Sequence, residues 1–314
     1  MTNISDIAKM SGYSKATVSR VLNQKNYVSP QAKGKILAAI AALDYVPNDI
    51  ARDLSKGQTH NIGVVLPHVE HPFFSEILKG IIQQAFSTSY RIVILPSAYD
   101  EKLELTYLEQ LRSKAFDALI FTSHGVSLAT LAAYQKYGPV ICCENPQNAK
   151  LPAVYVERAP AYEAAFQWLK DQSKWPVAIL LSRPAAMSAT SQATLMAYQK
   201  IFGKLPRPAL VFTEIVTPKD GYQAAAELIR RGEKVAAVFS NGDDIAVGFA
   251  KAYHKNNLPQ PLLIGQDQQL SGELLQLPTI DHHLRAIGEA AFTLATTKKP
   301  TQTIAIPAAW IPQR

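Results

Sequence analysis

The 314 residues include only two cysteines, Cys142 and Cys143, which are adjacent in an apolar run. Neighbouring cysteines cannot join distant parts of a chain, so a disulfide framework is excluded and buried thiols are indicated. No apolar run reaches the ~20 residues that a membrane-spanning helix needs, and no membrane association is expected. The N-terminus also lacks the apolar core of a signal peptide, so we expect a cytoplasmic protein.

Motifs of common enzymes are missing as well. The sequence has no Gly-x-Ser-x-Gly elbow and no glycine-rich phosphate loop. His282 and His283 lack a partner at the i+4 spacing of a helical metal site, and His68 and His71 would share a metal only by accident of a loop. We therefore expect no catalytic residues, no metal and no cofactor. An enzyme remains the alternative that a turnover screen would expose.

Acidic residues are scarce at the N-terminal end. The first 60 residues hold eight basic and four acidic side chains, a net charge of +4 out of the formal +7 of the whole chain. Such clustering is typical of a segment that binds a polyanion such as DNA. A solvated basic face is the alternative, and charge alone does not separate the two.

The same N-terminal segment is predicted to form a helix-turn-helix. Asn3 can cap a first helix that Gly12 ends, and Ser14 can cap a second one. The apolar faces of the two helices consist of Ile7, Ala8 and Met10, and of Val18, Val21 and Leu22. Two helices with so short a link form the unit that lays its second helix in the DNA major groove. An ordinary helical hairpin is the alternative.

Two further helices are predicted before the sequence changes character. A third helix begins at Ser29-Pro30, a cap followed by proline at the first helical position. Its apolar stripe consists of Ile36, Leu37, Ile40 and Leu43. Asn48 can cap a fourth segment, Asp49 to Leu54, which is too short to be a stable isolated helix.

From Asn61 onward, short apolar runs alternate with helical segments. The predicted strands are Ile62–Leu66, Ile92–Leu95, Ala118–Phe121, Val140–Cys143, Val154–Val156, Val177–Leu181, Leu210–Phe212, Ala236–Phe239 and Leu262–Ile264. Continuous apolar strands separated by helices predict parallel sheets covered on both faces, and their number suits two sheets. Ligands in such folds bind beyond the carboxyl ends of the strands or between two lobes.

Motifs along essentially the whole chain resemble those of the LacI/GalR family of bacterial repressors, and within it the catabolite-control proteins. They are Asp6-Ile7-Ala8, Gly12-Tyr13-Ser14, Ala16-Thr17-Val18-Ser19-Arg20-Val21-Leu22-Asn23, Val28-Ser29-Pro30, Leu43-Asp44-Tyr45-Val46-Pro47-Asn48, Ala51-Arg52-Asp53-Leu54, Ile62-Gly63-Val64-Val65-Leu66-Pro67, His71-Pro72-Phe73-Phe74, Phe116-Asp117-Ala118-Leu119-Ile120 and Asp243-Asp244-Ile245-Ala246-Val247-Gly248. Motifs in this order and spacing are highly specific.

The resemblance implies an all-α helix-turn-helix head with a hinge helix, followed by an α/β core of two lobes like a periplasmic binding protein. We expect the head at residues 1–46, the hinge and linker at 47–60, and the effector-binding and dimerisation core at 61–314. The first lobe would comprise about 61–147 and 281–303. The second lobe would comprise about 150–278 and 304–314.

The resemblance also implies which residues contact DNA. Lys15, Ala16 and Arg20 occupy positions that the family places against base edges, and an arginine fork suits guanine. Lys15 could instead clamp a phosphate, and Ser14 could be a helix cap alone. The other expected contacts of the head, mostly to phosphates, are Thr17, Ser19, Asn23 and Tyr27.

In the hinge, Asn48, Ala51 and Leu54 match positions that the family brings to the central minor groove. Leu54 would wedge a base step, at an unstacking cost of a few kcal/mol that the bent duplex offsets with further contacts. A leucine at the end of a linker helix could equally be packed core.

The effector residues are carried over from the family one at a time. Phe73, Asp243 and Asp267 are the main candidates, and Ser123, His124 and His282 are weaker ones because strand-end histidines are more often structural. Two further candidates concern a missing charge. Thr194 stands where the family often has an arginine, and Arg183 could supply a cation from elsewhere.

The expected function is therefore that of a homodimeric, nucleoid-associated repressor of a pseudo-palindromic DNA operator, controlled by a sugar or sugar phosphate. Catabolite-control relatives can bind the phosphoprotein HPr through the helix matching Leu284–Thr297, but Thr293 and Thr297 replace the basic residues that this requires. A solute-binding protein of a sugar transporter and an architectural DNA binder with a vestigial cleft remain as alternatives.

Overall fold

A computed structural model describes residues 3–23, 27–46 and 57–312. The chain divides into two compact units, Met1–Thr59 and His60–Arg314, and each is described by itself. None of the described helices has the length and apolar character that crossing a membrane requires.

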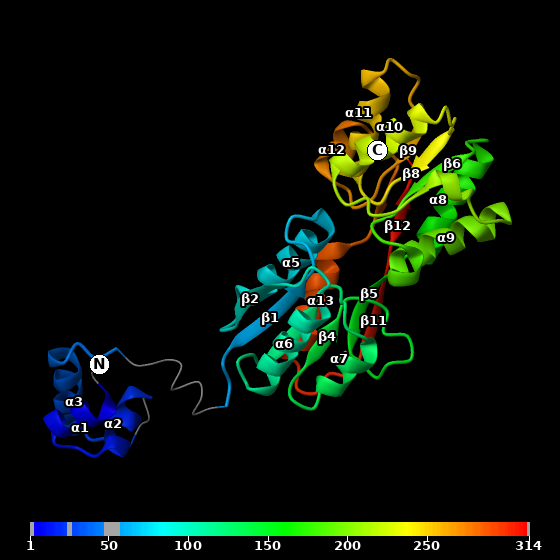
Figure 1. Cartoon of the computed structure of the whole chain (residues 1–314). Helices are drawn as coiled ribbons and strands as arrows, with labels where there is room; N and C mark the ends of the chain where they lie inside the picture. The colour runs from blue at the N-terminus through cyan, green and yellow to red at the C-terminus, as the bar shows by residue number, and fades with distance from the viewer. Residues whose placement is uncertain (1–2, 24–26, 47–56, 313–314) are drawn as a thin grey trace. The chain divides into compact units, whose positions relative to one another are not determined.

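The N-terminal unit contains the three predicted helices, α1 (Ile4–Ser11), α2 (Lys15–Leu22) and α3 (Pro30–Ala42) (Figure 1). The caps predicted for these three helices are confirmed. The Asn3 side chain accepts a hydrogen bond from the backbone N–H of Ser5, and the Asp6 carboxylate accepts one from the backbone N–H of Asn3. Gly12 ends α1 with a φ of 76°, and Ser14 caps α2. These local contacts fix both ends of the turn between α1 and α2.

The core of this unit is small. Ile7, Val18 and Ile36, one from each helix, are fully buried and pack together with Val21 and Ala39. Two residues of the predicted apolar stripes are outside it, because the side chains of Met10 and Leu37 are 56% and 48% exposed.

The first lobe of the second unit is built on a parallel sheet with strand order β11-β5-β4-β3-β1-β2. Its strands are β1 (Asn61–Leu66), β2 (Arg91–Pro96), β3 (Ala118–Phe121), β4 (Val140–Cys142), β5 (Ala153–Glu157) and β11 (Thr303–Pro307). Helices α5 (Pro72–Ala85) and α13 (Leu284–Thr296) cover one face, and α6 (Glu101–Arg112) and α7 (Leu128–Tyr134) cover the other (Figure 1). Cys142 and Cys143 are buried free thiols, as predicted, and burial raises the pKa of Cys143 to about 12.

Helices α5 and α13 meet backbone to backbone. A Cβ atom at Gly80 would lie 2.1 Å from the carbonyl oxygen of Arg285, and one at Gly288 would lie 2.0 Å from that of Ile77. Only glycine allows the two helix axes to come this close.

The second lobe is built on a parallel sheet with strand order β7-β6-β8-β9. Its strands are β6 (Val177–Leu180), β7 (Val211–Phe212), β8 (Ala237–Phe239) and β9 (Leu262–Ile264), and its helices are α8 (Ala159–Asp171), α9 (Ala189–Phe202), α10 (Pro218–Arg230), α11 (Asp243–Lys255) and α12 (Leu270–Leu274). All nine predicted strands are thus confirmed, and the prediction of two parallel sheets is correct.

The connections between the lobes contain strands of their own. A third sheet pairs β10 (Thr279–Asp281) with β12 (Ala309–Ile311) in antiparallel register, and it was not predicted. Strands β5 and β11 pair with each other in the first-lobe sheet. That sheet therefore extends to Glu157 and Pro307, beyond the expected limits near residues 147 and 303.

Candidate functional site

The second helix of the N-terminal unit presents polar and basic side chains to solvent. Lys15, Ala16 and Arg20 are exposed on α2, whereas Val18 and Val21 are buried. Helix α2 therefore has the division that groove insertion requires, with one face packed and the other free.

The polar residues expected at phosphates lie at the two ends of α2. The Ser14 hydroxyl accepts a hydrogen bond from the backbone of Thr17 at 3.3 Å and also contacts the Thr17 hydroxyl at 2.9 Å. Asn23 donates to the carbonyl oxygen of Ser19 at 2.8 Å, and Tyr27 is 91% exposed. Asn48, Ala51 and Leu54 of the predicted hinge lie outside the described residues.

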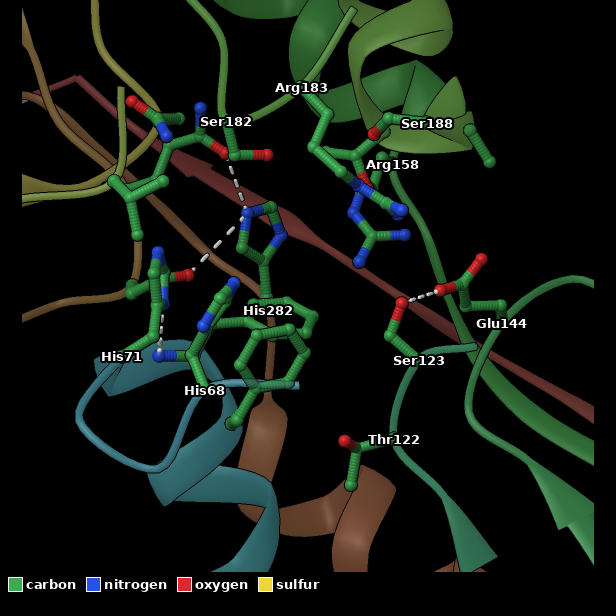
Figure 2. Close-up of a pocket in the computed structure, with 18 of the residues that line it drawn as sticks. His68, His71, Thr122, Ser123, Glu144, Arg158, Ser182, Arg183, Ser188 and His282 are labelled. Carbon is green, nitrogen blue, oxygen red and sulfur yellow. Dashed lines mark hydrogen bonds and ion pairs between the residues drawn. The ribbon is translucent and has the colours of Figure 1, made fainter. Parts of the chain in front are cut away.

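A cavity of about 90 Å³, partly open to solvent, lies between the lobes of the second unit. Its polar and aromatic lining comprises His68, His71, Phe73, Phe74, Tyr99, Thr122, Ser123, Glu144, Arg158, Ser182, Arg183, Ser188, Thr190, Asn241, Gln266, Asp267 and His282 (Figure 2). Most of these residues lie within three residues of the end of a parallel strand, so the carboxyl ends of both sheets face the same space.

Five of the eight predicted effector residues line this cavity: Phe73, Ser123, Arg183, Asp267 and His282. His124, Thr194 and Asp243 are not among the lining residues. His124 contacts the carbonyl oxygen of Val126 at 2.7 Å, and the buried Thr194 hydroxyl donates to the carbonyl oxygen of Thr190 at 3.0 Å.

Asp243 has a structural environment. Its buried carboxylate accepts hydrogen bonds from the Thr279 hydroxyl at 3.0 Å and from the backbone of Gln269 at 2.8 Å. A Cβ atom at Gly265 or Gly272 would lie 1.8 or 2.2 Å from the same carboxylate oxygens. Asp243 thus holds the loop after β9 instead of facing the cavity.

Residues that the sequence analysis did not select include Glu144, Arg158, Asn241 and Gln266. Arg158 directly follows β5, and the other three come within two residues of the ends of β4, β8 and β9. The strand-end rule would have found them had it been applied to every predicted strand, including those at the lobe crossings.

A buried hydrogen-bond chain fixes the protonation of His282. The Gln266 amide nitrogen donates to the carbonyl oxygen of Ser240 at 2.6 Å, so its oxygen is the acceptor for the Tyr162 hydroxyl at 3.0 Å. The same oxygen is 2.8 Å from Nε2 of His282, which must therefore carry the proton. The Nδ1 atom of His282 is then an acceptor, and it has no partner among the described residues.

Unpartnered buried polar atoms are concentrated at this cavity. Among the described residues, four buried side-chain atoms lack a hydrogen-bond partner: Arg158 Nε, Asn241 Oδ1, Asp267 Oδ1 and His282 Nδ1. All four residues line the cavity. Buried polar groups are normally paired, so their grouping in one space indicates that a polar ligand or ordered water completes them.

Burial favours the uncharged forms of His71, Asp267 and His282. Burial and the nearby His68 lower the pKa of His71 to about 4, and burial followed by Arg158 lowers that of His282 well below its ordinary value. Burial, with the nearby Asp243 carboxylate, raises the pKa of Asp267 to about 8. At neutral pH these two imidazoles are neutral and most of the Asp267 carboxyl is protonated.

Asp267→Asn is expected to change how stability depends on pH. Between its ordinary pKa of 3.8 and the folded value of about 8, Asp267 is protonated in the folded protein and ionised in the unfolded chain. Its contribution to the free energy of unfolding therefore falls as pH rises, by up to about 1.4 kcal/mol per pH unit.

Urea unfolding of wild type and Asp267→Asn is measured from about pH 5 to pH 8. The difference between their free energies of unfolding isolates the contribution of Asp267, because the histidine contributions cancel in it. Wild type should lose stability relative to the variant as pH rises. Parallel stability curves would contradict the assignment.

Comparison with known proteins identifies the architecture. The protein-family model described as "Periplasmic binding proteins and sugar binding domain of LacI family" matches residues 59–311. The family model described as "Bacterial regulatory proteins, lacI family" matches residues 3–48. The chain belongs to the LacI family. The expected DNA-binding transcriptional regulator with a ligand-binding core is thereby confirmed, and LacI-family regulators are not enzymes.

Relatives of known function cover nearly the whole chain. Catabolite control protein B of Bacillus subtilis (strain 168) is 35% identical over 96% of each chain. The NTD biosynthesis operon regulator NtdR of the same organism is 30% identical, over 93% of this chain and 91% of its own. These matches extend the LacI-family assignment through both units.

Solved structures show the same fold. The Lac repressor dimer bound to operator and the anti-inducer ONPF matches with a TM-score of 0.80 at 20% identity, over 99% of this chain and 98% of that one. A LacI-family regulator from Lactobacillus casei with bound glucose matches with a TM-score of 0.72 at 21% identity, over 81% of this chain and 98% of that one.

No group of side chains suited to a metal ion occurs in the described part of this LacI-family chain.

Proposed function

We propose that the chain is a homodimeric repressor that binds a pseudo-palindromic operator in the cytoplasm and responds to a sugar or sugar phosphate. The observation that carries the ligand-controlled part is the grouping of four unpartnered buried polar atoms in one inter-lobe cavity. Two of them, Asn241 Oδ1 and His282 Nδ1, are placed to accept hydrogen bonds that ligand hydroxyls would donate.

The relatives support a role in carbon-source or catabolite regulation. Besides catabolite control protein B, they include the sucrose operon repressor of Pediococcus pentosaceus and the ribose operon repressor of Halalkalibacterium halodurans. The Lac repressor, a dimer when bound to its operator, supports a dimer here.

In the proposed mechanism, Arg20 reads a base pair in each half-site, Lys15 reads a base or clamps a phosphate, and Leu54 enters the minor groove. Ligand binding in the cavity changes the angle between the lobes and the spacing of the two hinges. The ligand can shift DNA affinity only to the extent that it prefers one lobe arrangement.

Titration of the full chain against a pseudo-palindromic duplex with a central CG step, and against a scrambled duplex, tests DNA recognition. We expect tight binding to the first duplex alone at near-physiological salt, where non-specific contacts are weak. Equal binding to both duplexes, followed by failure to select any preferred site from random DNA, would contradict the proposal.

Two alternatives are disfavoured by specific features. A solute-binding protein would have no use for the confirmed helix-turn-helix unit. An architectural DNA binder with a vestigial cleft gives no reason for four buried polar atoms without described partners to group in one cavity. Direct capture of HPr is also disfavoured, since Thr293 and Thr297 direct their hydroxyls to carbonyl oxygens of α13 itself.

A further inference from the structure

We propose that the ligand of the inter-lobe cavity is an anion, a polyhydroxylated molecule whose phosphate or carboxylate group binds between Arg158 and Arg183. This inference rests on the proposed function, since it names the chemical class of the effector. It begins from the two guanidinium groups that reach into the cavity in Figure 2.

Neither arginine has a carboxylate partner among the described residues. Arg158 donates from Nη1 to the carbonyl oxygen of Val156 at 3.3 Å, and its buried Nε has no acceptor. Its guanidinium carbon lies 5.7 Å from the centroid of the Phe73 ring. The guanidinium carbon of Arg183 lies 3.8 Å from the centroid of the Tyr99 ring. Both cations are thus held by aromatic faces, which position a guanidinium without neutralising it.

The carboxyl groups of the cavity do not balance these charges. Glu144 accepts a hydrogen bond from the Ser123 hydroxyl and lies 3.7 Å from His124. The carboxyl of Asp267 is mostly protonated at neutral pH, because burial raises its pKa to about 8. Two guanidinium groups therefore face the cavity, and neither Glu144 nor Asp267 forms an ion pair with them. A partly buried, unpaired charge is costly, and a ligand of opposite sign removes that cost.

The start of α9 adds to the same preference. Its capping residue Ser188 and its first residues Ala189 and Thr190 line the cavity. The first turn of a 14-residue helix carries a partial positive charge and free backbone N–H groups, which favour an anion. In the view of Figure 2, Ser188 lies on the same side of the cavity as both arginines.

Other atoms of the cavity lining suit hydroxyl groups. Asn241 Oδ1 and His282 Nδ1 are unpartnered acceptors, and the His282 side chain is only 2% exposed. Buried acceptors of this kind match ligand O–H donors. A charged group at the arginines and hydroxyls at Asn241 and His282 together describe a sugar phosphate or a sugar acid.

Isothermal titration calorimetry of the full chain with glucose 6-phosphate, gluconate, glucose and inorganic phosphate tests the inference. We expect at least one of the anionic sugars to bind about tenfold or more tightly than glucose, with an affinity that falls as salt is added. Phosphate compared with gluconate identifies which anion the arginines accept. Equal affinity for glucose and both anionic sugars would overturn the inference.

Arg158→Gln and Arg183→Gln are each expected to weaken the anionic sugar about tenfold or more and to leave glucose nearly unchanged. Arg230→Gln is the matched control, because Arg230 is exposed on α10 and does not line the cavity. Melting of each ligand-free variant establishes that it folds. Equal losses for glucose and the anionic sugar would overturn the inference.

Two outcomes separate this inference from the proposed function. If anions bind through the arginines but leave DNA affinity unchanged, the anion site stands and effector control fails. If a neutral sugar changes DNA affinity and no anion binds, effector control stands and the anion site fails. The anion site also fails if no anionic probe, inorganic phosphate included, raises the melting temperature of wild type more than that of the double arginine variant.

Discussion

Arg20→Ala is expected to abolish most of the preference for operator over scrambled DNA. A bidentate contact from arginine to guanine contributes about 1–3 kcal/mol of discrimination, and a dimer makes it twice, so operator affinity should fall on the order of a hundredfold or more. Arg20 is exposed on α2, which leaves its guanidinium free to reach a base edge. Binding to the scrambled duplex should weaken only by the loss of one positive charge per chain.

Two control variants separate base recognition from charge. Arg20→Lys keeps the charge but loses the planar fork, so it should retain binding to the scrambled duplex and lose operator preference. Lys33→Ala removes an exposed charge from α3 and should weaken both duplexes alike. Fluorescence anisotropy with both duplexes gives the ratio of operator affinity to scrambled-duplex affinity directly. A wild-type ratio in Arg20→Ala would exclude Arg20 as a base reader.

Ile36→Ala is expected to unfold the N-terminal unit while the ligand-binding core stays folded. Ile36 is fully buried among Ile7, Val18 and Val21. Truncating such a side chain costs about 2–5 kcal/mol, and a domain of about 60 residues has little stability beyond that. Operator binding should be lost, whereas ligand binding and the main melting transition should be unchanged.

The matched control is Leu37→Ala, the next residue along α3, whose side chain is 48% exposed. Its cost should be well under half that of Ile36→Ala, because little apolar surface leaves the core. Circular dichroism and NMR of methyl groups in α1–α3 report the state of this unit. Retained head signals and DNA binding in Ile36→Ala would show that the small core is more robust than its burial pattern indicates.

The parallel strands could be predicted because they are buried on both faces. Val64, Ile120 and Val238, for example, are fully buried and stand in unbroken apolar runs. Strands β10 and β12 carry no such pattern: the residues of β12 are only half-buried, and the pair is held by hydrogen bonds between segments 30 residues apart in the chain. Long-range pairing of this kind leaves no local signal.

The cavity was predictable in location but only partly in detail. Strand ends identify which residues lie near the space between the lobes, but not which way their side chains turn. Asp243 follows β8 yet turns toward Gly265, Gly272 and Thr279, because the two glycines leave room for its carboxylate. Position 194 holds threonine where the family often has arginine, so the sequence suggested that the cavity lacks a cation. Arg158 provides a cation there, from a segment that crosses between the lobes.

The backbone contact between α5 and α13 makes these two helices move as one rigid body. Helix α5 begins at Pro72, and its second residue, Phe73, lines the cavity. Its 14 residues at 1.5 Å each give a length of about 21 Å. Beyond its far end, Ser89 hydrogen-bonds His60, the first residue of the core, at 3.1 Å. The contacts between α5 and α13 join backbone atoms at glycines, so no side chain can rotate to absorb a movement of one helix against the other. We therefore expect a displacement at the cavity to be transmitted in full to His60. Amide hydrogen exchange around Ser89 should then change when ligand binds.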